Sequence, residues 1–110
     1  MLDGSGQITA FSHRSTSGAG AVGPVASAKT WYHVVGVYEN SSLRYVYING
    51  ALYTSNATGE NVNSPDNFRI GSRKYSGGES EFFDGKIDDV RIYNRLLSAS
   101  EILQLYNMGK

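Results

Sequence analysis

Short runs of apolar residues, separated by polar turn sequences, recur along most of the 110-residue chain. β-branched and aromatic residues dominate these runs, which is typical of strands rather than helices. The pattern predicts strands over residues 6–13, 20–25, 31–38, 43–48, 51–55, 68–72 and 81–93. The segments between them are rich in Gly, Ser and Asn, and we expect loops over residues 56–67 and 73–80. The pattern therefore predicts an all-β protein with tight turns.

The clearest hairpin lies in the middle of the chain. The run Trp31–Tyr38 is β-branched and aromatic throughout, which is typical of a strand buried on both faces or nearly so. After the next run comes Asn49-Gly50, the strongest short hairpin signal, because both central positions of a type I′ turn need positive φ. Residues 51–55 should therefore pair back on residues 45–48.

The end of the chain has the signals of a helix. Ser98 and Glu101 have the spacing of a capping box, in which each side chain accepts a hydrogen bond from the other residue's backbone N–H. Ile102, Leu105 and Tyr106 fall at i, i+3 and i+4 and share one helix face. We therefore expect a short C-terminal helix that packs on a sheet.

The predicted strand 81–93 contains a conflict of parity. Ile87 is at an odd position, whereas Val90 and Ile92 are at even positions, so a regular strand would place them on opposite faces. A bulge near Gly85 or within residues 88–89 would resolve the conflict.

Composition excludes several classes of protein. Ten Lys+Arg balance ten Asp+Glu, so there is no electrostatic footprint for nucleic acid or an anionic membrane. The absence of cysteine excludes disulfides and thiolate chemistry. No run approaches the roughly 18 apolar residues of a membrane span, so membrane insertion is not expected. The first residues have no features of a signal peptide, and the length suits one domain.

Four landmarks occur in an order that resembles a known family. They are Trp31–Tyr38, Tyr45–Gly50, Phe68–Gly71 and the stretch Phe83–Ile102, which contains Gly-Lys-Ile-Asp-Asp-Val-Arg-Ile-Tyr-Asn-Arg. Together they resemble laminin-G-like, concanavalin A-type jelly-roll domains over residues 31–107, about the last two-thirds of a usual domain. The resemblance implies an antiparallel two-sheet jelly-roll sandwich with one short C-terminal helix, as a single domain over residues 1–110.

The N-terminal part of the chain departs from the family pattern. Family members normally begin with strands of the type F-T-i-s-x-W-v, and none precedes the predicted strand 6–13. Without such strands, sheet edges are left open, and an open edge pairs with another chain. Two outcomes are expected, a smaller closed sandwich or a homodimer, and we favour association.

The resemblance implies a non-catalytic, lectin-like module that binds carbohydrate outside the cell or at its surface. The alternative is a protein-interaction or structural module that assembles through exposed sheet edges. Sugar recognition pairs an aromatic face with planar polar side chains. The candidate ligand-binding residues combine both kinds near loop ends, and they are Tyr53, Asp66, Asn67, Arg73 and Tyr75. A solvated loop without ligand remains the alternative for them.

The densest carboxylate cluster has two interpretations. Asp84, Asp88 and Asp89 could bind calcium, which takes several oxygen ligands and which some relatives use in sugar recognition. Alternatively, these carboxylates accept hydrogen bonds from turn amides or pair with Lys86 and Arg91. Calcium is therefore the one candidate cofactor, and the metal ligands stay undefined.

Hydrolysis is not expected. The resemblance extends to jelly-roll endoglucanases, whose E-x-D-x-E strand carries the nucleophile and the general acid. When that motif is aligned on Asp88, Lys86 and Val90 stand where both glutamates are required. His13 and His33 are the only histidines, and we expect His33 to be a packed, hydrogen-bonded side chain rather than part of a triad. The sequence therefore offers no catalytic residue.

Overall fold

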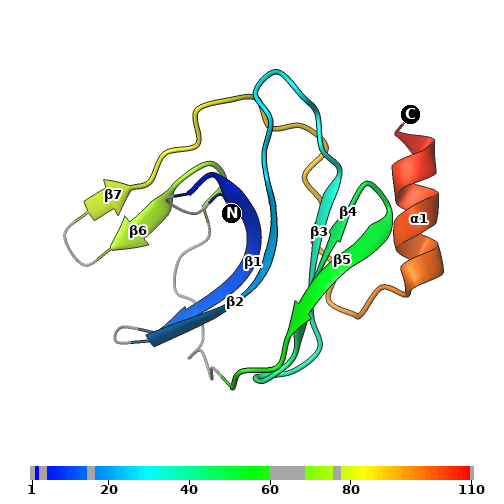
Figure 1. Ribbon diagram of the computed structural model, residues 1–110, viewed down its shortest axis with the longest axis horizontal. Coiled ribbons are helices and arrows are strands. Elements are labelled where there is room, and N and C mark those ends of the chain that lie inside the picture. The colour runs from blue at the N-terminus through cyan, green and yellow to red at the C-terminus, as the bar shows by residue number, and fades with distance from the viewer. Residues whose placement is uncertain (1, 3–4, 15–16, 60–68, 76–77, 110) are drawn as a thin grey trace.

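The structure is a computed structural model that describes residues 2, 5–14, 17–59, 69–75 and 78–109. Within these residues the chain forms antiparallel strands followed by one helix (Figure 1). The elements in chain order are β1 (Gln7–Arg14), β2 (Ser17–Val25), β3 (Val34–Tyr38), β4 (Arg44–Ile48), β5 (Ala51–Asn56), β6 (Arg73–Tyr75), β7 (Gly78–Ser80) and α1 (Ala99–Met108). No helix in the described part of the chain has the length and apolar character needed to cross a membrane.

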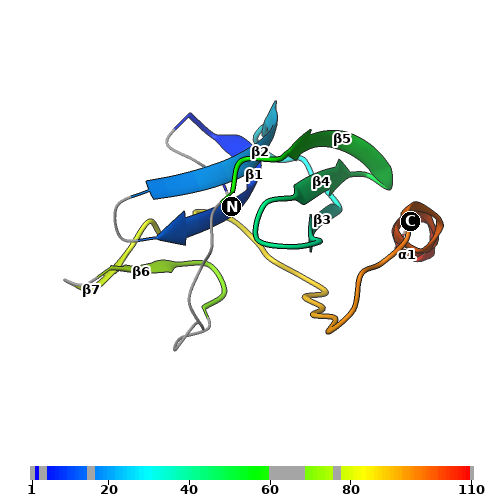
Figure 2. The same cartoon turned by 90° about the horizontal axis from the view of Figure 1, so that it is seen from below.

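The strands form a layered arrangement. The β1–β2 hairpin packs on a three-stranded sheet of order β3-β4-β5, and α1 lies on the far side of that sheet from the hairpin (Figures 1 and 2). Ile8, Ala10, Ala21 and Val46 form the buried core between the two sheets. A separate small hairpin joins β6 and β7. The predicted all-β sandwich with one short C-terminal helix is thus confirmed.

The hairpin between β4 and β5 has the predicted turn. Asn49 and Gly50 have φ of 51° and 81°, so both central positions lie in the left-handed region. The pairing of Ile48 with Ala51 follows directly from this turn. Asn49 also fixes the start of β3, since its N–H donates to the His33 carbonyl at 2.8 Å and its Oδ1 accepts the His33 N–H at 3.0 Å.

The predicted capping box starts α1. Ser98 Oγ accepts the Glu101 N–H at 3.2 Å, and Glu101 Oε2 accepts the Ser98 N–H at 2.8 Å. Arg95 adds two donors to the same carboxylate, the shorter at 2.8 Å. Ile102 is fully buried, which confirms the predicted packing face.

We expect the ion pair between Arg95 and Glu101 to contribute stability that depends on pH. The Arg95 guanidinium, together with the Ser98 N–H, lowers the pKa of Glu101 from 4.5 to about 2. Because the folded pKa is lowered, this contribution is present above about pH 4.5 and is lost as the pH falls through 2. Glu101→Gln preserves the cap but removes the charge. Thermal unfolding should therefore show Glu101→Gln less stable than wild type at pH 6, with the difference vanishing near pH 2; a constant difference would contradict this.

Three predictions about the second half of the chain are wrong. Residues 81–93 form no strand, although Asp89 has a φ of 51° that interrupts the extended path where a bulge was predicted. Residues 69–72 also form no strand, and the predicted loop over 73–80 contains the β6–β7 hairpin instead. A strand is stable only when its backbone groups pair with a neighbour. Residues 81–93 have the sequence of a strand, and the Phe83 N–H donates to the Gly71 carbonyl at 2.8 Å, but the described residues form no ladder beside them.

Candidate functional site

The most distinctive local feature is the free edge of β3. β3 is the outer strand of the three-stranded sheet and pairs only with β4 among the described strands. The His33 carbonyl accepts from Asn49, and the Glu39 N–H donates to the Leu43 carbonyl at 3.0 Å, so odd-numbered positions direct their backbone groups toward β4 and its flanking turns. Even-numbered positions must direct theirs to the open side. These positions are Val34, Gly36 and Tyr38.

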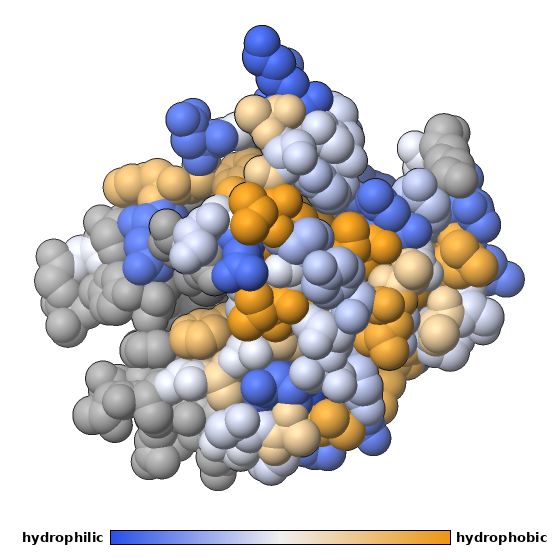
Figure 3. Space-filling view, viewed as in Figure 1, coloured by the Kyte–Doolittle hydropathy of each residue, from blue (hydrophilic) through white to orange (hydrophobic). Residues whose placement is uncertain are grey.

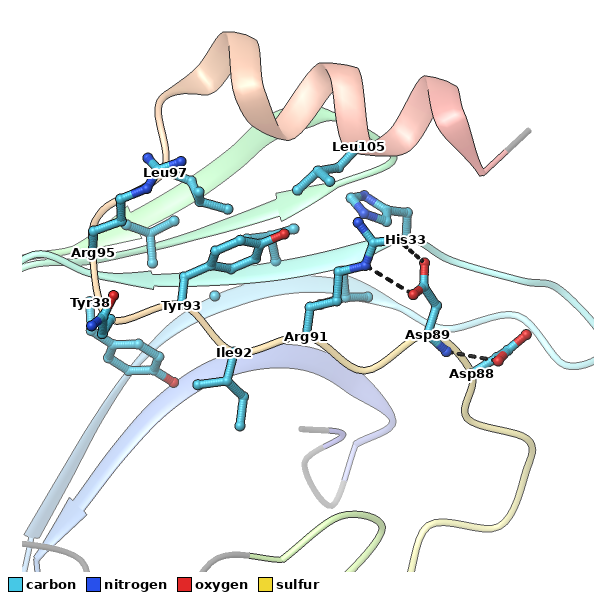
Figure 4. A pocket seen from close by; sticks show the side chains of 15 residues that line it. His33, Tyr38, Asp88, Asp89, Arg91, Ile92, Tyr93, Arg95, Leu97 and Leu105 are labelled. Atoms are coloured by element: carbon cyan, nitrogen blue, oxygen red, sulfur yellow. Dashed lines mark hydrogen bonds and ion pairs between the residues drawn. The ribbon is translucent and has the colours of Figure 1, made fainter.

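A groove of about 570 Å³ runs along this free edge (Figure 4). One wall is β3 together with His33, and the opposite wall is the segment 88–95. Leu97 and Leu105 of the C-terminal region close one side of it with apolar surface. The groove therefore lies between a strand edge and a second length of backbone that belongs to no sheet.

The opposite wall has the alternation of an extended chain. In Figure 4, the side chains of Arg91 and Tyr93 point toward one side of the segment, whereas Ile92 points the other way. This two-residue period is that of a strand. The wall is therefore extended like a strand without being hydrogen-bonded as one.

Apolar side chains around the groove are left exposed. Val34 is 45% exposed, Tyr38 is 49% exposed and Ile92 is 71% exposed. Figure 3 shows apolar surface gathered over the middle of the molecule and toward α1. The prediction that Trp31–Tyr38 is a strand buried on both faces is therefore wrong: β3 starts at Val34, and Trp31 is itself 64% exposed. The sequence of β3 suits a strand that is covered on both faces, but the contacts of β3 with β1 leave Val34 and Tyr38 about half exposed.

The charges at one end of the groove satisfy one another. Arg91 Nε lies 3.0 Å from Asp89 Oδ1, and this carboxylate raises the pKa of Arg91. Asp88 Oδ1 accepts the Asp89 N–H at 2.8 Å. These contacts match the interpretation of the aspartates as partners of a turn amide and of Arg91. In the part of the chain that the structure describes, no three His, Cys, Asp or Glu side chains come together to hold a metal, and calcium stays a prediction.

Two ring side chains line the groove at β3. The Tyr38 hydroxyl donates to the Phe11 carbonyl at 3.2 Å, and partial burial raises the pKa of Tyr38. His33 packs against Tyr106 with ring centroids 5.8 Å apart, which confirms its predicted packing. The predicted hydrogen bond is not found, since the buried His33 Nδ1 has no partner among the described residues.

The candidate sugar-binding residues fall in different parts of the fold. Tyr53 lies on β5, where the register with β4 shifts, and its side chain is 55% exposed. Arg73 and Tyr75 begin and end β6, which lies away from β5 in both Figure 1 and Figure 2, and their side chains are outside the described set. Asp66 and Asn67 lie outside the described residues. A shared sugar site for these five residues remains a prediction.

Comparison with protein families identifies the fold. The family model for the concanavalin A-like lectin/glucanases superfamily, of laminin G type, matches residues 1–103. The chain belongs to this superfamily. A search of curated proteins found no match. Among solved structures, this chain is similar in fold to an S-layer domain-containing protein from Clostridium thermocellum, with a TM-score of 0.63 and 20% sequence identity. The match covers 96% of this chain and 65% of the other, so the chain spans less than two-thirds of that structure's length.

Membership of the superfamily, together with the layered strands, fits a binding or structural module. The superfamily includes both lectins and glucanases. Sequence reasoning did not locate the groove, although it did predict open sheet edges. The feature that marks the groove is the strand-like sequence 81–93, which pairs with no strand in the described part of the chain.

Proposed function

We propose that the chain is a non-catalytic protein-interaction module that binds polypeptide through the free edge of β3. The observation that carries this proposal is the outward-facing backbone of Val34, Gly36 and Tyr38 beside the groove. An unpaired strand edge offers a row of donors and acceptors that another extended chain satisfies, as in β-strand addition. Superfamily membership and the S-layer neighbour support a place outside the cell or at its surface.

We expect Val34→Lys to weaken association of the chain with polypeptide at least tenfold, because a lysine on a free edge opposes strand pairing. Val22→Lys is the matched control, since Val22 is 43% exposed on β2 and does not line the groove. Light scattering over a concentration series measures self-association, and a displayed library of nine-residue peptides measures capture of other chains. Equal association of the two variants would contradict the proposal, as would a wild-type chain that neither self-associates nor captures peptide.

Carbohydrate binding is the second candidate function. Its support is the lectin branch of the superfamily and the exposed ring of Tyr53. If this ring stacks on a sugar, Tyr53→Ala should weaken binding about five- to tenfold, since an aromatic stack contributes about 1 kcal/mol. Leu52→Ala is the control, because Leu52 is its neighbour on β5 and is similarly exposed. Affinity electrophoresis in polysaccharide gels, with calcium and with chelator, measures both; no retardation of wild type on any polysaccharide would exclude this candidate.

A further inference from the structure

We infer that the occupant of the groove is a single extended strand of a partner polypeptide, apolar on both faces, which lies between β3 and the segment 88–95. This inference rests on the proposed function and specifies its partner. It follows from three features of the groove: its two walls, the chemistry on its two sides, and the unpaired backbone opposite β3.

The two walls favour one strand over the edge of another sheet. β3 bounds the groove on one side, and the segment 88–95 bounds it on the other (Figure 4). A second copy that paired through its own β3 would bring its β4 directly behind that strand. The segment 88–95 stands in the place such a second strand would need. A lone strand has no such neighbour, so the segment 88–95 does not oppose it.

The two sides of the groove set the pattern of the partner strand. A side chain at position 36 would point toward the β1–β2 layer, since a Cβ built on Gly36 would lie 3.5 Å from Ala10 Cβ. The even-numbered side of β3 therefore faces the sandwich interior, where Val34 and Tyr38 are half exposed. On the other side, Leu97 and Leu105 supply apolar surface, and the Arg91 guanidinium there is already paired with Asp89 (Figure 4). Strands covered on both faces are apolar at consecutive positions, so the partner should have a continuous apolar run rather than an alternating one.

The unpaired backbone opposite β3 would gain the neighbour it lacks. Residues 90–93 have a strand-forming sequence, and the side chains of Arg91, Ile92 and Tyr93 alternate in direction, yet these residues belong to no described ladder. Asp89, with its φ of 51°, limits the straight part at one end. A strand in the groove can hydrogen-bond to β3 with one edge and to residues 90–93 with the other. This arrangement satisfies backbone groups on both walls at once.

Selection from a displayed library of nine-residue peptides tests the inference. Selection is made on wild-type chain, with counter-selection on Val34→Lys. Enriched peptides should contain four or more consecutive apolar residues rich in β-branched and aromatic types. They should bind as a 1:1 complex and lose at least tenfold in affinity for Val34→Lys but not for Val22→Lys. Hydrogen exchange should slow at the amides of Val34, Gly36 and Tyr38, and also within residues 90–93. Circular dichroism of both variants verifies that they are folded.

The other outcomes separate this inference from the proposed function. Enriched peptides with strictly alternating apolar and polar residues would overturn the two-faced strand and leave the β3 edge as the binding site. So would a homodimer with slowed exchange at β3 and unchanged exchange over residues 90–93, because the occupant would then be a second copy. A wild-type chain that enriches no peptide and stays monomeric would overturn both proposals.

Discussion

Replacing Arg44 by alanine is expected to destabilise the fold by about 3 kcal/mol, because it removes a fully buried side chain together with three hydrogen bonds from a charged donor. Arg44 is fully buried at the first position of β4. Its guanidinium donates to Asn56 Oδ1 at 2.8 Å, to the Thr58 carbonyl at 3.1 Å and to the Ser41 carbonyl at 3.2 Å. Few side chains of this type are completely buried in proteins, so a buried arginine has a structural task.

That task is to hold one end of the three-stranded sheet together. Ser41 belongs to the turn between β3 and β4, whereas Asn56 ends β5 and Thr58 follows it. One guanidinium thus joins a turn and a strand end that are well separated in sequence. Arg44→Ala should therefore loosen the end of β3 at Tyr38, which lines the groove, in addition to lowering global stability.

Chemical denaturation measures the loss, and Arg91→Ala is its control. Arg91 pairs with Asp89, but its side chain is 44% exposed, so its loss should cost much less than the loss of Arg44. Arg44→Lys should fall between the two, because a lysine has one compact donor head and cannot reach three acceptors in the geometry of a guanidinium. A cost for Arg44→Ala as small as that of Arg91→Ala would mean that the buried contacts are not needed.

The sequence was sufficient where the signal is local. The Asn49-Gly50 turn and the Ser98–Glu101 capping box depend on residues at most three positions apart, and both occur as predicted. Their stabilising contacts form within the segment itself, so little tertiary information is needed to predict them.

The sequence predicted strands wrongly where the presence of a neighbouring strand decides whether a segment becomes one. The sequence 81–93 has strong strand propensity, but a strand needs a hydrogen-bonded neighbour, and none is described beside it. The opposite error occurred at β6 and β7, whose polar sequence has no apolar alternation and was therefore predicted as loop. In both cases the partner strand, rather than the segment's own composition, determined the outcome.

The sequence predicted the kind of site, an open sheet edge, but not its location. Comparison of the sequence with its family predicted open sheet edges, but which edge stays free depends on strand order, and that is a property of the tertiary fold. The burial of Arg44 was equally inaccessible, because an arginine in a strand sequence is normally expected at the surface. Tyr53 was named from its place near a loop end, and the structure does leave its ring exposed on β5.

Gly50→Ala is the second substitution expected to have a large effect, at about 3 kcal/mol. Two costs combine at this position. With a φ of 81°, Gly50 holds a left-handed conformation that costs an L-residue about 1–2 kcal/mol. An added Cβ would also lie 2.9 Å from Tyr106 Cδ1 and 3.0 Å from Leu103 Cδ1, both on α1, so these side chains or the helix must shift to admit it. Overpacking of this kind typically costs a further 1–3 kcal/mol.

Gly71→Ala separates these two costs. Gly71 has a φ of 79°, almost the same as that of Gly50, but the nearest atom to an added Cβ is Ile87 Cδ1 at an ordinary 3.6 Å. Its substitution should therefore cost only the backbone strain, about 1–2 kcal/mol. Chemical denaturation should show Gly50→Ala as clearly the more damaging of the two, and equal losses would mean that α1 is not seated on the turn. Because Leu105 of α1 closes one side of the groove, a helix displaced by Gly50→Ala should also weaken peptide capture, whereas Gly71→Ala should leave it unchanged.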